Sequence, residues 1–306
     1  MAEAYIIDAV RTPRGIGKPG KGALSHLHPQ HLAATALKAI KDRNHLDTST
    51  VDDIIWSTSS QVGKQGGDLG RMSALAAGYD ITASGTTLDR FCGGGITSVN
   101  LACASVMSGM EDCVIAGGTE MMSFTAAYGA EQANAGIKPL GMGSGNAALD
   151  VLHPQSHQGV CGDAIASIEG ISREALDALA LVSQQRADVA IKEGRFAKSV
   201  VPVYNEDGSV ALDREEFPRP ETTAEGLAAL KPAFKPDGLV TAGNSSQISD
   251  GAAAVLVTSE EAAGRLGLTP RARIVRTALA AADPILMLTA PIPATARILD
   301  RARLTL

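Results

Sequence analysis

The stretch Leu88-Asp89-Arg90-Phe91-Cys92-Gly93-Gly94-Gly95 indicates where a strand gives way to a helix. Residues 81–88 before the turn form a short extended run. After the turn, apolar residues recur at spacings of three and four, namely Ile96, Val99, Cys103, Val106 and Met110. This spacing predicts one apolar face of a helix of about four turns. Cys92 is therefore expected at a strand-to-helix turn, beside the N-terminus of the helix.

This predicted position favours chemistry at the sulfur of Cys92. Unpaired amides and the dipole at a helix N-terminus stabilise an anion, so we expect an increased thiolate fraction. The three glycines that follow remove side chains from the first turn, which lets a substrate carbonyl approach the backbone N–H groups. A nucleophile beside oxyanion donors is what acyl transfer requires.

A packing role is the alternative for each of the four cysteines. Unpaired cysteine is commonly buried and chemically inert. Cys103 lies on the apolar face of the predicted helix and Cys113 enters an apolar run, so both fit this role. Local features alone leave both roles open for Cys92.

Composition restricts the class of protein. The 306 residues contain 32 glycines, 45% hydrophobic residues and only 3% aromatic residues, which favours an Ala/Gly/Val-rich α/β protein with tight helix–sheet packing. The net charge of −6 argues against nucleic acid and anionic membrane as partners. Residues 1–10 lack a long apolar run, so we expect no signal peptide or membrane span and a cytoplasmic location.

The histidines and cysteines do not predict a metal site. His26, His28 and His31 are close together, but no fourth ligand or carboxylate pattern accompanies them, so surface histidines are the interpretation. No cysteines have metal-ligand spacing, and the four together indicate a reducing compartment rather than a disulfide scaffold.

Strands and helices alternate along residues 1–121, which predicts a layered α/β domain with a substantially parallel core. We expect strands at 4–10, 53–57 and 112–118, and helices at 29–44 and 69–77.

The pattern changes after residue 121. Residues 124–154 are rich in glycine and alanine with few helix-length patterns, which indicates a functional insertion. Residues 241–251 form a dense turn cluster that is either a plain loop or a backbone-lined ligand site. Around them we expect helices near 157–170 and 172–193, a hairpin over 200–212, a proline-bounded helical region at 219–234, a strand at 252–257 and a helix to 266.

From residue 272 the opening order repeats. A strand-like run at 272–281 and a helix from about Pro293 follow the same order as residues 4–44. The second copy stops at Leu306. A half-domain of one strand and one helix cannot cover its own sheet faces, so we expect the sequence to be cut short.

Several motifs together resemble those of a known protein family. They are Asp8 to Pro13, the Cys92 turn, Gly117 to Ser123, Glu193 to Phe196, Arg219 to Thr223 and Thr241 to Gly251. With these motifs the chain, from Ala4 to Leu306, resembles the thiolase family (3-ketoacyl-CoA thiolase or acetyl-CoA C-acetyltransferase). The resemblance implies a thiolase-like layered α/β fold of two similar halves. Residues 1–121 and 248–271 would form the N-terminal half, 122–247 an inserted loop domain that binds CoA, and 272–306 the start of a truncated C-terminal half.

The resemblance also implies site residues. Cys92 resembles the nucleophile that becomes acylated, with its own backbone N–H as one oxyanion donor. His157 resembles a histidine lining the pantetheine tunnel, although without the resemblance it would be interpreted as a helix cap. Ser246 resembles a serine touching the pantetheine arm, and Arg219 a residue at the adenine and phosphate end. The full set implied to bind substrate or CoA is Leu149, His157, Gln158, Arg219, Leu230, Ala233, Phe234, Ala242 and Ser246.

Some residues depart from the family pattern. Gln158 stands where many relatives have Met beside the acyl pocket, which affects the expected chain length of the substrate. Phe91 and Gly94 are an unusual nucleophile context. The motifs Asn-Glu-Ala-Phe, Gly-His-Pro and a second Cys-x-Gly, which carry the activating histidine and the proton-shuttling cysteine, belong to a region beyond Leu306. Cys161 lacks the context to replace that cysteine and is expected to be packing.

The resemblance implies an acyl-CoA:acetyl-CoA C-acyltransferase that acts on acyl-CoA and 3-ketoacyl-CoA. It implies CoA as a substrate, no permanently bound cofactor, and a homodimer or homotetramer. One alternative is a decarboxylating condensing enzyme of the same fold, against which the motifs between Glu193 and Gly251 argue. The other is a non-catalytic CoA-binding or assembly protein.

Overall fold

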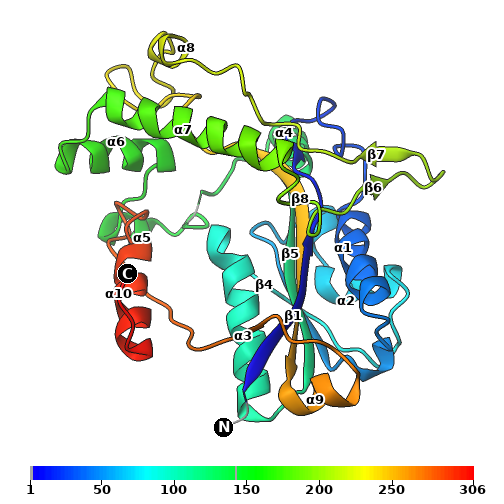
Figure 1. Cartoon of the computed structure of the whole chain (residues 1–306). Helices are drawn as coiled ribbons and strands as arrows, with labels where there is room; N and C mark the ends of the chain where they lie inside the picture. Colours follow the sequence, from blue (N-terminus) through cyan, green and yellow to red (C-terminus); the bar gives the residue numbers. More distant parts are fainter. Residues whose placement is uncertain (1–2, 142) are drawn as a thin grey trace. The chain divides into compact units, whose positions relative to one another are not determined.

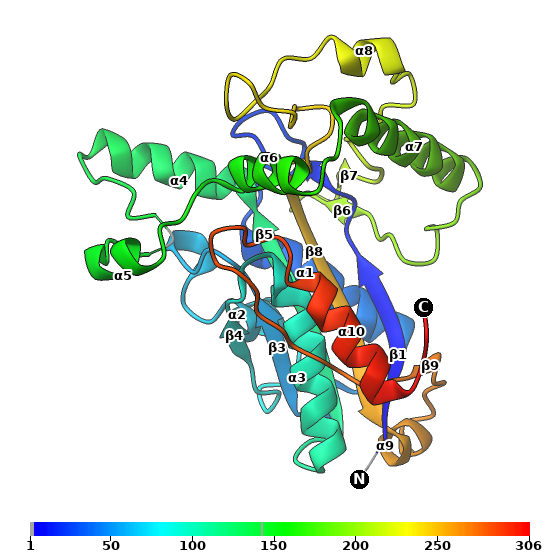
Figure 2. The same ribbon diagram turned by 90° about the vertical axis from the view of Figure 1, so that its left-hand side faces the viewer.

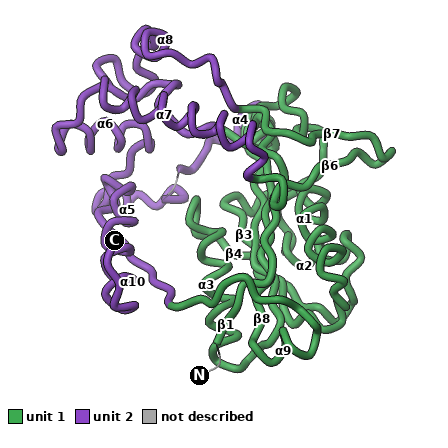
Figure 3. The backbone as a smooth tube through the Cα atoms, viewed as in Figure 1, with its two compact units in different colours: residues 1–131, 196–217, 248–275 green, residues 132–195, 218–247, 276–306 purple. Residues whose placement is uncertain are grey.

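The computed structural model describes residues 3–141 and 143–306. It contains two compact units, shown in separate colours in Figure 3. Unit 1 comprises Met1–Glu131, Phe196–Phe217 and Ile248–Val275, and unit 2 comprises Gln132–Arg195, Pro218–Gln247 and Arg276–Leu306. The assignment of residues to two family halves and a loop domain stays a prediction.

Unit 1 is built on one mixed sheet with the strand order β4-β3-β5-β8-β1-β9, and β2 pairs with β8 (Figure 1). The strands are β1 (Ala4–Arg11), β2 (Gly15–Ile16), β3 (Asp53–Ser57), β4 (Thr86–Leu88), β5 (Cys113–Met121), β8 (Ser249–Ser259) and β9 (Ala272–Arg273). β1 and β8 run side by side for most of their length, as Figures 1 and 2 show.

The sheet is less parallel than the sequence predicted. Among the strands of the described residues, β3 pairs in parallel with β4 and with β5, whereas β8 lies antiparallel between β5 and β1. The register explains the direction of β8, because Met121 at the end of β5 pairs with Asp250 near the start of β8. The chain re-enters the sheet at the edge where it left, so the new strand runs back along β5.

Helices cover both faces of this sheet. α1 (Pro29–Arg43) and α2 (Leu69–Ala76) pack on one face and α3 (Gly94–Ser108) on the other (Figure 1). Consecutive residues of a strand point to opposite faces, so Ile54 joins the core under α1 and α2 while Ile55 joins the core under α3. The layered α/β fold expected from the sequence is therefore present.

One helical stretch, Phe91–Ser108, is long and apolar enough to cross a membrane by length and composition, and 33% of it is buried. Its inward side contributes Ala102, Cys103 and Val106, each with no exposed surface, to the core beneath the sheet. One side of this helix therefore packs on the sheet of unit 1.

Local sequence patterns correctly predicted the bounds or caps of several helices and strands. β3 has the expected bounds, α1 begins at Pro29, and Ser259 caps α9 (Glu260–Arg265) by accepting from the Ala262 amide. The expected hairpin is formed by β6 (Val203–Tyr204) and β7 (Val210–Leu212). Single turns of 3-10 helix lie at Thr48–Thr50 (η1), Gly63–Gln65 (η2) and Phe91–Gly93 (η3).

Other expectations are corrected. Residues 124–154, expected to have few helices, include most of α4 (Met122–Asn134) and all of α5 (Ala147–Leu152), whose first turn the Asn146 side chain caps. The run at 272–281 contributes only the two residues of β9, and the region 219–234 only α8 (Ala224–Ala228). The remaining helices are α6 (Gln158–Ile168), α7 (Arg173–Lys192) and α10 (Pro291–Ala302).

We expect Gly94→Ala to destabilise unit 1 by about 2 kcal/mol. A Cβ at position 94 would lie 1.7 Å from Ser57 Oγ and 2.9 Å from Ser57 Cβ, and Ser57 is buried at the end of β3. Urea unfolding curves of the wild type and the variant measure the change in free energy.

Gly95→Ala is the matched control, because a Cβ at position 95 meets no atom within 4 Å. This variant should be as stable as the wild type or more stable by up to about 1 kcal/mol, since alanine favours helix more than glycine. Equal stabilities of the two variants would contradict the packing argument.

Candidate active site

Cys92 lies in the middle of η3, between the end of β4 and the start of α3, and its side chain is exposed. Phe91 before it has a φ of 47°, which a bulky residue rarely adopts. The Phe91 amide donates to Asp89 Oδ1 at 2.6 Å, and this bond supports the unusual backbone. The expected turn position of Cys92 is therefore observed, with a 3-10 turn inserted before the helix.

Fewer backbone amides around Cys92 are free to donate hydrogen bonds than the sequence predicted. The Gly93 amide donates to the Arg90 carbonyl at 3.0 Å, and the Gly94 amide donates to the Phe91 carbonyl. The 3-10 turn uses these two donors, so they are not free for a substrate carbonyl. Among the hydrogen bonds of the described residues none uses the Cys92 amide, so this N–H remains available as an oxyanion donor.

The other three cysteines are buried. Burial raises the pKa of the Cys103 thiol to about 11, and it raises the pKa of the Cys113 thiol to about 12. Cys161 in α6 is 2% exposed, and its Sγ donates to the Ile285 carbonyl at 3.1 Å. The expected packing roles of Cys103 and Cys113 are confirmed by their burial, so Cys92 is the accessible thiol among the four.

In unit 2, His157 and Phe234 lie together. Their rings stack with centroids 4.7 Å apart and 25° between planes. His157 is also the N-cap of α6, because its Nδ1 accepts from the Gly159 amide at 3.1 Å. A Cβ at Gly159 would lie 2.1 Å from the Phe234 ring, so glycine at this position permits the close approach. The capping role that the sequence alone favoured for His157 is thus observed.

The other residues that the resemblance implied for CoA binding also lie in unit 2. Arg219, Ala233, Ala242, Ser246 and Gln158 are exposed, and Leu149 in α5 is half-buried. Leu230 and Phe234 are large apolar side chains that are 38% and 36% exposed. The residues from Leu230 to Ser246 combine exposed apolar and polar side chains, which suits a ligand with both kinds of surface, and their role in binding stays a prediction.

The sequence did not single out a polar cluster beside this segment. Arg173 and Asp177 of α7 form an ion pair of 2.7 Å, and Asn244 donates to Asp177 at 2.9 Å. The i,i+4 spacing of Arg173 and Asp177 is a signal in the sequence, but it also describes ordinary exposed pairs on a helix.

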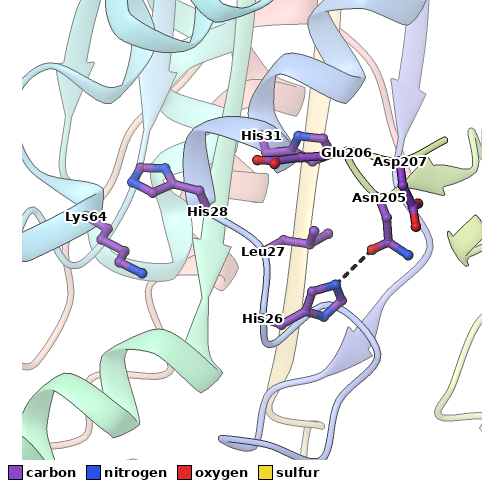
Figure 4. A pocket seen from close by; sticks show the side chains of 8 residues that line it. All are labelled: His26, Leu27, His28, His31, Lys64, Asn205, Glu206 and Asp207. Carbon is purple, nitrogen blue, oxygen red and sulfur yellow. Dashed lines mark hydrogen bonds between the residues drawn. The ribbon is translucent and has the colours of Figure 1, made fainter. Parts of the chain in front are cut away.

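The histidines at 26, 28 and 31 surround a cavity of about 540 Å³ in unit 1 (Figure 4). His26 Nε2 hydrogen-bonds Asn205 Oδ1 at 2.8 Å, and His31 Nε2 hydrogen-bonds the Tyr204 carbonyl at 2.7 Å. His28 caps α1, and burial followed by the charge of Lys64 lowers its pKa. In residues 3–141 and 143–306 no group of three His, Cys, Asp or Glu side chains could hold a metal ion. None of the residues implied by the resemblance lines this cavity.

Iodoacetamide at neutral pH should alkylate Cys92 at least about tenfold faster than any other cysteine, because the other thiols are buried. Mass spectrometry of tryptic peptides over time measures the four rates. Cys92→Ser should abolish the fast phase, and urea should make the three buried thiols reactive. A fast phase at Cys103, Cys113 or Cys161 in the native protein would contradict this site.

Comparisons with known proteins agree with the motifs. The family model described as "Thiolase, N-terminal domain" matches residues 4–261. A 3-oxoadipyl-CoA/3-oxo-5,6-dehydrosuberyl-CoA thiolase of Escherichia coli is 40% identical over 317 residues, which cover 100% of this chain and 78% of the relative. A steroid 3-ketoacyl-CoA thiolase of Mycobacterium tuberculosis is 40% identical, and the match covers 100% of this chain and 74% of that relative. A 3-ketoacyl-CoA thiolase of a Shewanella species is 38% identical, and the match covers 100% of this chain and 77% of that relative. This chain therefore belongs to the thiolase family of acyl-CoA C-acyltransferases.

Proposed function

We propose that the chain exchanges acyl groups between CoA thioesters through a covalent intermediate on Cys92. The reaction is thiolysis of a 3-ketoacyl-CoA or, in reverse, Claisen condensation of two acyl-CoAs. The observation that supports Cys92 is its exposure in η3 with an amide that no described hydrogen bond uses, whereas the other thiols are buried. The names of the relatives support the thiolase reaction and do not favour a decarboxylating or non-catalytic role.

In the first half-reaction, the Cys92 thiolate attacks carbon 3 of the 3-ketoacyl-CoA. The bond between carbons 2 and 3 then breaks, and the acetyl-CoA enolate leaves and takes a proton from solvent on carbon 2. A thioester remains on Cys92. The N–H of Cys92 donates to the oxyanion of the tetrahedral state, and one such donor contributes on the order of 3 kcal/mol.

In the second half-reaction, CoA loses its thiol proton to solvent, and the resulting thiolate attacks the thioester carbonyl. The carbon–sulfur bond to Cys92 breaks, and the shortened acyl-CoA leaves with the thiolate of Cys92 restored. The first half-reaction converts the ketone at carbon 3 into a thioester on Cys92 by breaking a carbon–carbon bond, and the second exchanges that thioester for one on CoA. CoA therefore serves as a substrate, and neither step as written uses a permanently bound cofactor.

The CoA substrate is assigned to the segment of unit 2 that contains Leu230, Ala233, Phe234, Ala242 and Ser246. Apolar surface on Leu230 and Phe234 suits the pantetheine arm, and the exposed guanidinium of Arg219 suits phosphate. Gln158, exposed at the first turn of α6, is assigned to the selection of the acyl chain. The proposal includes a cytoplasmic homodimer or homotetramer.

Radiolabelled acetyl-CoA tests the covalent step. We expect up to one acetyl group per chain, bound as a thioester that neutral hydroxylamine releases, because an exposed thiolate exchanges with an acyl thioester. Cys92→Ala should lower the rate of labelling by more than tenfold, which corresponds to about 1.4 kcal/mol of activation free energy. Cys103→Ala is the control and should label as the wild type does. Labelling of Cys92→Ala within tenfold of the wild-type rate would show that the nucleophile is another residue.

Phe234→Ala should weaken CoA binding about tenfold, since it removes an exposed aromatic surface and its stacking on His157. Isothermal titration of CoA measures the dissociation constant. Phe196→Ala is the control, because Phe196 is an exposed aromatic residue of unit 1. Unchanged CoA affinity in Phe234→Ala would remove this segment from the binding site.

A further inference from the structure

The loop of residues 231–238 in unit 2 has no regular secondary structure of its own. It contains Ala233 and Phe234, which the proposed function assigns to CoA binding. A loop that is disordered before binding loses conformational entropy when it closes on a ligand, and this loss weakens affinity. Backbone contacts pair the two sides of the loop, because Pro232 bridges to Thr241 and the Ala233 amide donates to the Val240 carbonyl at 2.9 Å. Side chains from outside the loop add contacts at both of its ends.

One end of the loop is fixed by Arg173 of α7. Its Nη2 donates to the Leu227 carbonyl at 2.7 Å and to the Leu230 carbonyl at 3.0 Å. The Leu227 carbonyl lies in α8 and also accepts from the Leu230 amide at 3.1 Å, and the Leu230 carbonyl lies two residues beyond the helix. Arg173 therefore holds the backbone between the end of α8 and the start of the loop.

The other end is fixed by Asn244. Its Oδ1 accepts from the Thr241 amide at 2.8 Å, and its Nδ2 donates to the Leu239 carbonyl at 3.1 Å. Asp163 of α6 adds to this anchor, because its Oδ1 accepts from the amides of Leu239 and Val240 at 2.6 and 2.9 Å. The turn that follows the loop is thus held by side chains from outside it.

Asp177 joins the two ends. Its Oδ2 accepts from Arg173 Nε at 2.7 Å, and its Oδ1 accepts from Asn244 Nδ2 at 2.9 Å. The Asp177 side chain is 8% exposed and that of Arg173 is 18% exposed. A charge-assisted bond shielded from water is stronger and more specific in geometry than an exposed ion pair. The two oxygens of the Asp177 carboxylate therefore bond to Arg173 at one end of the loop and to Asn244 at the other.

We propose that Arg173, Asp177 and Asn244 are positioning residues that hold residues 230–246 in the conformation that binds CoA. This inference rests on the proposed CoA role of that segment. The three residues need not contact CoA, because they act by ordering the loop before it binds. Substitutions in the network therefore weaken CoA binding without changing the reactivity of Cys92.

Arg173→Lys is the main test. Lysine keeps a positive charge for Asp177, but it lacks the planar fork that reaches the two carbonyls and the carboxylate at once. We expect the dissociation constant for CoA, measured by isothermal titration, to rise about tenfold. The rate of Cys92 alkylation and the melting temperature should stay close to wild type, and a role limited to the ion pair would leave CoA affinity unchanged.

The same helix supplies a matched control. Lys192 and Asp188 of α7 also form an i,i+4 ion pair of 2.7 Å, but the lysine side chain is 72% exposed. Asp188→Asn should bind CoA as the wild type does. Asp177→Asn, which removes the shared carboxylate charge, should bind CoA more weakly than Arg173→Lys.

The outcomes separate the two proposals. Wild-type affinity in Arg173→Lys would overturn the positioning network, while CoA binding to the wild-type chain would still support the proposed function. Absence of CoA binding to the wild-type chain would contradict the CoA role of the segment itself. Equal losses in Arg173→Lys and Asp188→Asn would also overturn the network, because helix charge and not loop anchoring would then determine affinity.

Discussion

The close approach of the first turn of α3 to the end of β3 is the constraint on which the candidate nucleophile depends. Gly94 lies against Ser57 with no room for a Cβ, and Ser57 itself is buried. The first turn of α3 is therefore packed against β3. The chain passes from β4 to α3 through one 3-10 turn, and Cys92 in the middle of that turn is exposed. The exposure of the sulfur therefore follows from the packing of a neighbouring residue that has no side chain.

The same turn explains why one amide is left for chemistry. A 3-10 turn bonds each amide to the carbonyl three residues before it, and in η3 this pairing uses Gly93 and Gly94. The Cys92 amide comes one residue too early for a partner within the turn. Phe91 supports this geometry at a positive φ, which is a local cost that Asp89 offsets by accepting the Phe91 amide.

The sequence predicted features that depend on neighbours in the chain. The bounds of β3, the start of α1 at Pro29 and the cap of α9 at Ser259 follow from apolar runs and local hydrogen bonds. The antiparallel direction of β8 could not be predicted in this way, because the pairing of Met121 with Asp250 joins residues far apart in the sequence. The engaged glycine amides were also missed, since glycine spacing does not distinguish a 3-10 turn from the first turn of an α-helix.

Unit 2 shows the same division between local and long-range signals. The caps of α6 and α7 were visible in the sequence, as His157 and Ser172 before each helix. The loop between α8 and Thr241 has no comparable signal, because its contacts include side chains of α6 and α7 that are far from it in the sequence. In the sequence, Arg173 and Asp177 look like any exposed i,i+4 pair on a helix. Their contacts with Asn244 and with the backbone carbonyls of Leu227 and Leu230 are visible only in the structure. The segment proposed to bind CoA is thus held in part by Arg173, Asp177 and Asp163, which lie outside it. Motifs drawn only from the side chains assigned to the ligand omit these residues.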